Sequence, residues 1–367
     1  MTHKKNLLCK LTIVIPTYNR QDYAIRNMNF WSKREPNIIV IDGSKNSIPS
    51  KTIKNFGSNV KYIHDAAPIL RRLDRARSLI KTEYVSLLGD DEFFLSDGLL
   101  ASIKELDSDL SLVACMGRAL GFVHYKKNLI KGFFVYSDFK NYSVADDKPS
   151  MRMQSHMNQY APSTIYSVVR TPIWQAAFEA STLYEFPVNG IAELQFELAV
   201  SYFGKSKIIP ALHWLRSFEE KPIRESLVKD KSLDARNKFN DFWLSKEKSF
   251  LRGEFIQVTS KVLAEYNNRD INEVALEVKQ AMDLYSIAST QKYLSSKITI
   301  SRVLLNSLPI PLANLIRIFK YEFQNLFTNT FTLSSCAQRL SETGVKVNFC
   351  ELSEIEKIIL KFHLNRK

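Results

Sequence analysis

The sequence predicts an α/β fold: a mainly parallel central sheet flanked by helices, followed by a mostly helical C-terminal region. In the first part of the chain, short apolar runs rich in β-branched residues alternate with segments of helical spacing. This alternation is typical of parallel strands joined by helices. Beyond residue 220 only Gly253 and Gly344 remain of the 11 glycines, and charges recur at helical spacing, as in "INEVALEVKQAMDLYSIA".

Local patterns predict the elements of residues 10–110. We predict strands at "KLTIVIPTYNR", "NIIVIDGS", "NVKYIHD" and "YVSLLGDD", which are apolar runs that end in polar residues. Helical spacing recurs over residues 21–33, in "ILRRLDRARSLIKT" and in "SDGLLASIKELDSD", where Asp and Ser suit a helix cap.

The pattern of residues 111–220 is less regular. We predict strands at "LVACMGRALGF", "KGFFVYSDF", "STIYSVVR" and "IIPALHWLRSF". We predict helices at "TPIWQAAFEAS", which has proline at its start, and at "GIAELQFELAVSYFGK", with Gly204 as C-cap.

Charge and cysteine content limit the class of protein. The net charge of +13 suits nucleotide phosphates, anionic lipid headgroups or nucleic acid, and it fits a basic protein with no such partner equally well. The four cysteines show no zinc-type spacing, and free thiols are typical of a reducing cytoplasm. No run reaches the roughly 20 apolar residues that span a bilayer, and no small-residue cleavage site follows the N-terminal apolar run. We expect a cytoplasmic protein, either soluble or peripheral at the inner face of the membrane.

Three adjacent acids, Asp90, Asp91 and Glu92, stand where the fourth predicted strand ends. Adjacent carboxylates repel each other and are costly to desolvate. Ligands bind at the carboxyl ends of parallel strands, and Mg²⁺ or Mn²⁺ prefers carboxylate oxygens and bridges diphosphates. The acids therefore predict a metal site, and the alternative is a solvated loop before the next helix, although Asp97 fits a helix cap better.

In order and spacing, "TIVIPTYNR", "VIDGS" and "YVSLLGDDEFF" followed by "SDGL" resemble the family 2 glycosyltransferases of the GT-A fold. The similarity covers residues 10–100, and the "GDD" form resembles a bacterial polysaccharide-locus subgroup. It implies a GT-A-like (Rossmann-like) fold, a nucleotide-diphosphate sugar donor, most simply a UDP-sugar, and Mn²⁺ or Mg²⁺ as cofactor.

The resemblance gives roles to residues at the ends of the first two strands. Pro16, Thr17, Tyr18 and Arg20 match the loop that lines the nucleotide, and Asp42 matches the acid that contacts the base or ribose. We expect all five in the nucleotide site.

The acid run departs from the family pattern. The usual Asp-x-Asp-Asp reads Gly89-Asp90-Asp91-Glu92 here, so the first acid is missing. The resemblance implies that Asp90 contacts the nucleotide diphosphate and that Asp91, our first choice, and Glu92 hold the metal.

The helix predicted at residues 69–82 carries four arginines. Arg71, Arg72 and Arg75 could contact phosphate, since arginine pairs well with phosphate oxygens, and the alternative is a solvated helix face. We keep Arg72 in the predicted nucleotide site, together with Asp74, which stands where the family often has Asn.

An inverting transfer needs a base that takes the proton of the acceptor hydroxyl. The family supplies it from an acid at the start of a helix that ends near a glycine, and Glu193 and Gly204 fit that spacing. Glu193 replaces the more usual Asp. Glu197, one turn later, is the second choice, and a plain acid at a helix N-terminus is the alternative reading of Glu193.

Three side chains follow on the last predicted strand of this part. By resemblance His213 helps hold the metal and Arg216 neutralises the leaving diphosphate. Trp214 either stacks on a sugar or packs in the core.

We predict two regions. Residues 1–220 form a GT-A catalytic domain, with a nucleotide-sugar half at 1–110 and an acceptor half at 111–220. Residues 221–367 form a helical region that serves as a lid or oligomer contact, or as a membrane-surface element through "LLNSLPIPLANLIRIFKYEFQNLFTNTF".

The predicted function is a metal-dependent glycosyltransferase of hexosyltransferase type with no nucleic-acid partner. It moves a sugar to a hydroxyl of a glycan or lipid-linked acceptor in bacterial surface polysaccharide (capsule) synthesis, by single displacement with inversion. The alternatives are a non-catalytic glycan- or lipid-binding scaffold of the same fold and a nucleotidyltransferase, although "PTYNRQD" lacks the Gly-rich loop typical of the latter.

Overall fold

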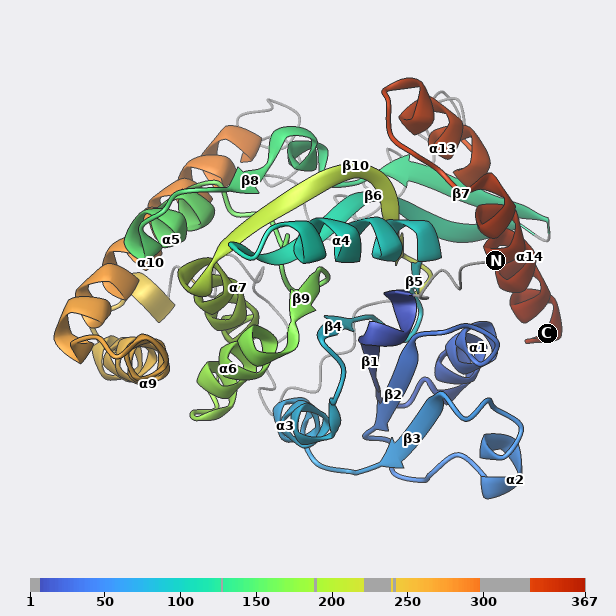
Figure 1. The fold of residues 1–367 in the computed structure, drawn as a ribbon, viewed down its shortest axis with the longest axis horizontal. Helices are drawn as coiled ribbons and strands as arrows, with labels where there is room; N and C mark the ends of the chain where they lie inside the picture. Colours follow the sequence, from blue (N-terminus) through green and yellow to red (C-terminus); the bar gives the residue numbers. More distant parts are fainter. Residues whose placement is uncertain are drawn as a thin grey trace, which may run out of the picture.

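A computed structural model describes residues 7–126, 128–187, 190–220, 239, 242–297 and 331–366. Its strands form one ten-stranded sheet (Figure 1). The strands are β1 (Leu11–Thr17), β2 (Asn37–Asp42), β3 (Val60–His64), β4 (Tyr84–Leu87), β5 (Phe93–Phe94), β6 (Leu112–Lys126), β7 (Leu129–Phe134), β8 (Ser143–Val144), β9 (Val168–Arg170) and β10 (Lys205–Ser217).

The sheet confirms the predicted fold class. Its strand order is β3-β2-β1-β4-β9-β6-β10-β5, with β7 beside β6 and β8 beside β10. The pairs β3–β2, β2–β1, β1–β4 and β6–β10 are parallel. The short strands β5, β8 and β9, together with β7, pair antiparallel with their neighbours. The long strands therefore present their carboxyl ends at one edge, where ligands bind in such sheets.

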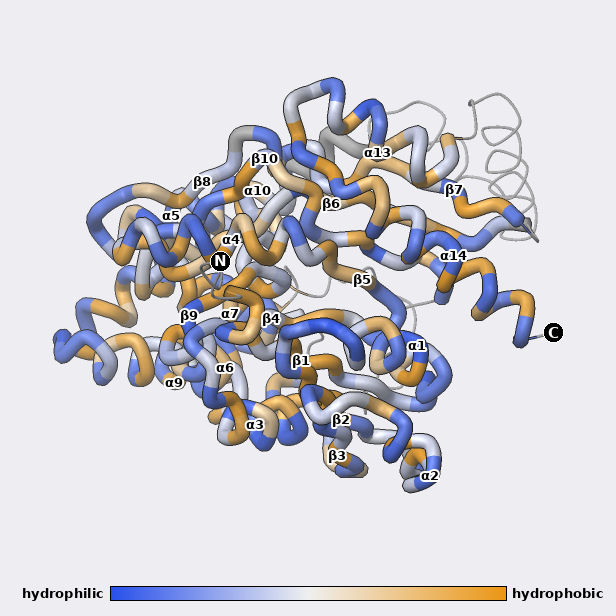
Figure 2. Tube along the Cα trace, turned by 45° about the vertical axis from the view of Figure 1, so that its right-hand side comes forward, coloured by the Kyte–Doolittle hydropathy of each residue, from blue (hydrophilic) through white to orange (hydrophobic). Residues whose placement is uncertain are grey.

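Helices cover both faces of the sheet. They are α1 (Gln21–Trp31), α2 (Ser50–Ile53), α3 (Ile69–Leu79), α4 (Ser96–Ser108), α5 (Pro149–Asn158), α6 (Thr171–Thr182), α7 (Ile191–Phe203), α9 (Ser249–Asn267), α10 (Ile271–Lys297), α13 (Leu333–Glu342) and α14 (Phe349–Asn365), with short 3₁₀ turns at Leu7–Lys10 and Ser137–Asn141. Figure 2 shows hydrophobic and hydrophilic residues alternating along peripheral helices such as α3 and α9.

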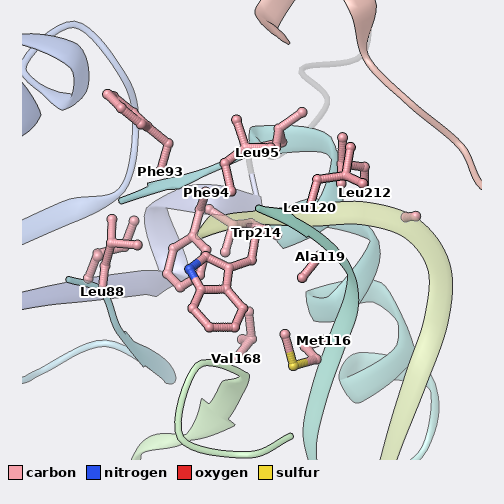
Figure 3. Close-up of a cluster of buried hydrophobic side chains, with 14 of the residues drawn as sticks. Leu88, Phe93, Phe94, Leu95, Met116, Ala119, Leu120, Val168, Leu212 and Trp214 are labelled. Carbon is pink, nitrogen blue, oxygen red and sulfur yellow. The ribbon is translucent and has the colours of Figure 1, made fainter. Parts of the chain in front are cut away.

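Two hydrophobic cores lie on opposite faces of the sheet. Along β1, Ile13 and Ile15 join one core and Val14 joins the other, as expected from the alternation of side chains along a strand. The first core takes in α1, α4, α13 and α14, and the second takes in α3, α5, α6, α7, α9 and α10. Figure 3 shows part of the first core, with the Trp214 indole among the side chains of Leu88, Phe94 and Met116.

The described part of the C-terminal region is helical, as predicted. Helices α9 and α10 pack against α5, α6 and α7, whereas α13 and α14 pack beside β6 and β7. The region therefore contributes to both cores. The predicted membrane-surface element at residues 304–331 lies, except for Phe331, outside the described residues. Within the described ranges, no helix is both long and apolar enough to cross a membrane.

Some predicted boundaries are wrong. In "STIYSVVR" only Val168–Arg170 is a strand, because the backbone N–H groups of Thr164 and Ile165 donate to the carboxylate of Glu197. The predicted Asp/Ser cap of α4 is absent: Leu95 is the N-cap, and Ser96 donates through its backbone N–H and its hydroxyl to Glu351 of α14.

Candidate functional site

The loop after β1 brings a cation to the acid run. Asn19 has a left-handed backbone (φ 55°), a conformation that Asn tolerates better than most residues, and its N–H donates to Ser44 Oγ at 2.8 Å. The next residue, Arg20, pairs with Asp90 (Nη2–Oδ1 2.5 Å) and with Asp91 (Nη1–Oδ2 3.2 Å). One guanidinium thus faces two of the three acids.

Helix α1 holds the backbone of the acid loop. Asn27 Nδ2 donates to the carbonyl oxygens of Asp90 (2.6 Å) and Glu92 (3.1 Å). Arg26 Nη2 donates to the carbonyl oxygen of Asp91 at 2.7 Å. The loop is therefore fixed by a buried amide and a buried guanidinium, and its carbonyl groups have the partners that burial requires.

The acids themselves are buried. Asp90 Oδ2 accepts a hydrogen bond from Thr17 Oγ1 at 2.7 Å. Burial raises the pKa of Asp90 to about 7 despite the opposing charge of Arg20, and burial also raises the pKa of Asp91. The cost of placing carboxylates at the end of a core strand is thus reduced by arginine, threonine and backbone contacts.

Glu92 turns away from Arg20 and folds over Gly89. Its Oε2 accepts hydrogen bonds from Trp214 Nε1 (3.0 Å) and from the Gly89 N–H (3.4 Å). Burial raises the pKa of Glu92 to about 8. A Cβ on Gly89 would lie 3.0 Å from the Glu92 carboxyl carbon, so a side chain at this position would require the Glu92 carboxylate to shift.

Asp42 and Arg72 lie below the same sheet edge. Asp42 is fully buried and accepts hydrogen bonds from the Ser44 N–H, Tyr62 Oη and Gln21 Nε2 at 2.6–2.8 Å. Arg72, also fully buried, donates to carbonyl oxygens at the ends of β1 (Thr17, 2.7 Å) and β2 (Ile41, 3.1 Å). Arg72 thus holds the carboxyl ends of β1 and β2 together through their carbonyl groups. We therefore do not include it in the proposed phosphate site.

The other predicted nucleotide residues differ in exposure. Pro16, the last residue but one of β1, pairs with Ile41 and is partly exposed, as is Tyr18 in the following loop. Asp74 forms an ion pair with Arg77, one turn later on the same helix, at 2.9 Å.

The predicted bases have different surroundings. Glu193 Oε1 accepts a hydrogen bond from Tyr160 Oη at 2.7 Å, and burial raises the Glu193 pKa. Glu197 is fully buried; it accepts hydrogen bonds from Thr164 and Ile165 and lies 3.0 Å from His156 Nε2. These contacts occupy both carboxylate oxygens of Glu197. Glu193 therefore remains the better candidate for the catalytic base.

Tyr166 is influenced by the charges of both the acid loop and Glu193. Its pKa is raised well above the usual value, first by burial and then by the charges of Glu92, Glu193, Glu197 and Asp91. Its ring stacks on Trp214, with centroids 4.2 Å apart. Both groups of carboxylates therefore lie within electrostatic reach of one tyrosine.

The structure separates the residues predicted on β10. Trp214 and Arg216 share one face of the strand, whereas His213 packs against α4 and Phe94, with Nδ1 3.4 Å from Ser102 Oγ. Burial lowers the His213 pKa to about 4. The packed alternative holds for Trp214, which is fully buried and stacked between Tyr136 and Tyr166.

Arg216 lies beside the acids within an aromatic surround. Its guanidinium donates to Tyr136 Oη and lies 5.2–5.8 Å from the ring centroids of Tyr136, Trp214 and Phe218. Burial lowers its pKa, which the charges of Glu92 and Asp91 oppose. Among the described residues, no carboxylate oxygen lies within 4 Å of its guanidinium nitrogens.

The described side chains do not fit the predicted metal trio. His213 is directed at α4, Glu92 at Trp214, and the carboxylates of Asp90 and Asp91 at Arg20. Nowhere in the described ranges do three or more His, Cys, Asp or Glu side chains gather as metal ligands. Arg20 is the described cationic partner of both aspartate carboxylates.

Sequence reasoning missed Arg26, Asn27, Tyr136 and Tyr166. A signal existed for Asn27, because it stands four residues after Tyr23 on the buried stripe of α1, where a polar side chain needs a partner. Tyr136 has a left-handed backbone (φ 52°), which no local pattern indicates.

No family model and no curated protein matches the sequence. Among solved structures, the chain is similar to S. aureus TarS. The crystal structure of TarS 1–349 matches with 12% identity and a TM-score of 0.43, over 78% of this chain and 91% of that chain. The same fragment in complex with UDP-GlcNAc matches with 14% identity and a TM-score of 0.44, over 78% and 92%.

Proposed function

We propose that this chain transfers a sugar from a nucleotide-diphosphate donor, a UDP-sugar in the simplest case, to a hydroxyl of a glycan or lipid-linked acceptor in bacterial surface polysaccharide synthesis. The observation that carries the proposal is the gathering at one sheet edge. Arg20, Asp90 and Asp91 lie there with Arg216, and the charges of Asp91 and Glu193 both raise the pKa of Tyr166.

The proposed reaction is a single displacement with inversion. The acceptor hydroxyl oxygen bonds to the anomeric carbon as the bond from that carbon to the diphosphate oxygen breaks. The hydroxyl proton passes to the Glu193 carboxylate, whose raised pKa makes it a better base than an exposed glutamate. The leaving diphosphate takes the electron pair, and the Arg216 guanidinium stabilises its charge.

No step is assigned to a metal ion, because the described acids face Arg20 and Trp214. The predicted requirement for Mn²⁺ or Mg²⁺ stays a prediction. It is tested by calorimetric titration of UDP, GDP and CDP into the protein, once with Mn²⁺ and once with chelator. Equal UDP affinity in both arms supports direct arginine contacts, and binding only with Mn²⁺ supports the metal.

Two variants test the division of roles. Arg216→Ala should weaken UDP binding about tenfold or more, because one charge-assisted contact is lost. Glu193→Gln should keep UDP affinity within about twofold, since the base does not contact the nucleotide, and should abolish release of UDP from UDP-sugar in the presence of acceptor. Full transfer by Glu193→Gln would contradict the assignment of the base.

A non-catalytic scaffold of the same fold is the second candidate, and one observation favours it. The carboxylates of Asp90 and Asp91 already have a cationic partner in Arg20, so the acid loop is stable without a ligand. A wild-type protein that binds no nucleotide in either arm of the titration would support this candidate.

A further inference from the structure

One buried arginine joins the acid loop to the residues that follow β10. Arg26 of α1 donates through Nη2 to the Asp91 carbonyl oxygen at 2.7 Å and pairs through Nη1 with Glu219 Oε2 at 2.9 Å. The side chains of Arg26 and Glu219 are 2% and 1% exposed. A pair buried this deeply resists separation, because either charge left alone would be costly.

The second partner of Glu219 comes from the last turns of the C-terminal helix. His363 Nε2 contacts Glu219 Oε1, and the His363 ring stacks on His124 of β6 at 4.1 Å. The neighbouring Phe362 ring lies 4.6 Å from the Arg26 guanidinium carbon and 4.7 Å from the Tyr23 ring. Figure 1 shows α14 running from α13, along β7, toward α1.

A second, more exposed layer surrounds this contact. Arg366 Nε pairs with Asp22 Oδ2 at 2.9 Å, and Arg366 Nη1 lies 3.6 Å from Glu220 Oε1. All three side chains are 42% exposed, so these pairs contribute little by themselves. The buried contact with Glu219 is therefore the one that fixes the end of α14.

Glu219 follows Arg216 by three residues and is tied to the site twice. Its N–H donates to Ser217 Oγ at 3.1 Å, and the Ser217 side chain lies close enough to Asp91 to lower the pKa of that carboxyl. Arg26 makes the second connection, to the Asp91 carbonyl group. Whatever holds Glu219 therefore also holds Arg26 against the backbone of the acid loop.

We propose that the end of α14 is a positioning element of the donor site: His363 holds Glu219, Glu219 holds Arg26, and Arg26 thereby keeps the acid loop in place opposite Arg216. This inference rests on the proposed function. It gives the C-terminal helix a role in binding the nucleotide, although no residue of α14 needs to touch the ligand.

The test compares two substitutions of one side chain. His363→Ala removes the donor to Glu219, whereas His363→Gln keeps an N–H donor at a similar reach. We expect UDP affinity, measured by calorimetry, to fall about tenfold in His363→Ala, as for one lost charge-assisted hydrogen bond. His363→Gln should stay within about threefold of wild type. Leu364→Ala, a change at an exposed neighbour on the same turn, should bind UDP as wild type does.

Each outcome decides between the two proposals. Wild-type affinity in a folded His363→Ala variant would overturn the positioning role and leave the proposed function intact. A wild-type protein that binds no nucleotide would remove both. If His363→Ala unfolds, Phe362→Leu tests the same contact by removing only the ring beside Arg26. It should weaken UDP binding about two- to fivefold with an unchanged melting temperature, and unchanged affinity there would also overturn the inference.

Discussion

Substitution of Tyr160 by Phe tests the assignment of Glu193 as base through its pKa. The Tyr160 hydroxyl donates to Glu193 Oε1 at 2.7 Å, and this bond lowers a pKa that burial has raised. A hydrogen bond to a charged group is worth about 1.5–3 kcal/mol, and one pKa unit corresponds to about 1.4 kcal/mol. Its loss should therefore raise the Glu193 pKa further, because the carboxylate loses a donor that favours its charged form. Because the base must be ionised, activity falls as the pH drops through this pKa, so the acidic limb of the profile should move to higher pH.

The assay is the rate of UDP release from UDP-sugar with acceptor, measured from pH 4.5 to 9 in wild type and Tyr160→Phe. Tyr84→Phe is the matched control, since Tyr84 donates to a carboxylate, Asp107, at the opposite end of β4. The control should leave the acidic limb in place. An acidic limb that stays put in Tyr160→Phe, or moves to lower pH, would refute the assignment of Glu193 as base.

Three further predictions concern the fold. Glu197→Ala should lower the free energy of unfolding by about 3 kcal/mol or more in urea titration, since the buried donors of Thr164 and Ile165 lose their acceptor; a loss below 1 kcal/mol would contradict the contacts. Gly43→Ala should cost about 1–3 kcal/mol, because the new Cβ would lie 2.4 Å from the Arg72 guanidinium carbon, whereas Gly253→Ala, in open space on α9, should gain about 0.5–1 kcal/mol. A thiol reagent at pH 8 should label two cysteines quickly in the folded protein and all four in urea. Burial raises the pKa of the other two thiols to about 12 and about 11, so fast labelling of all four in the folded protein would contradict that burial. The exposed pair is Cys9 and Cys350, and the buried pair is Cys115 and Cys336.

The sequence was informative wherever the signal was local. The four strands predicted in residues 10–110 are apolar runs whose ends carry the polar residues, so the sheet edge with Arg20, Asp42 and the acids could be predicted from spacing and resemblance. The pairing of Arg20 with Asp90 could not, because it depends on the left-handed turn at Asn19 and on how β1 lies beside β4. Contacts between residues 70 positions apart leave no trace in a local pattern.

Two predicted residues could have been assigned differently from the sequence itself. Neighbouring side chains on a strand point to opposite faces of the sheet, so His213 and Trp214 could not both face the acids. In the structure it is Trp214 that faces them, with its Nε1 donating to Glu92. Arg72 stands three residues after Ile69 and four before Ala76, on the apolar stripe of α3. An arginine on such a stripe is buried with the rest of the face, and here it binds carbonyl groups at the strand ends.

The two arginines at the sheet edge differ in what a ligand would gain from them. Arg20 already faces two carboxylates, so a diphosphate that approached it would compete with Asp90 and Asp91 for the same N–H groups. Arg216 is surrounded by aromatic faces and a tyrosine hydroxyl, which contact a guanidinium without neutralising its charge. Burial lowers its pKa, which means that its charged form is held at a cost in the free protein. An anion placed beside it relieves that cost, so the larger share of diphosphate affinity is expected from Arg216, and the acid loop, already paired with Arg20, sets where the anion can lie.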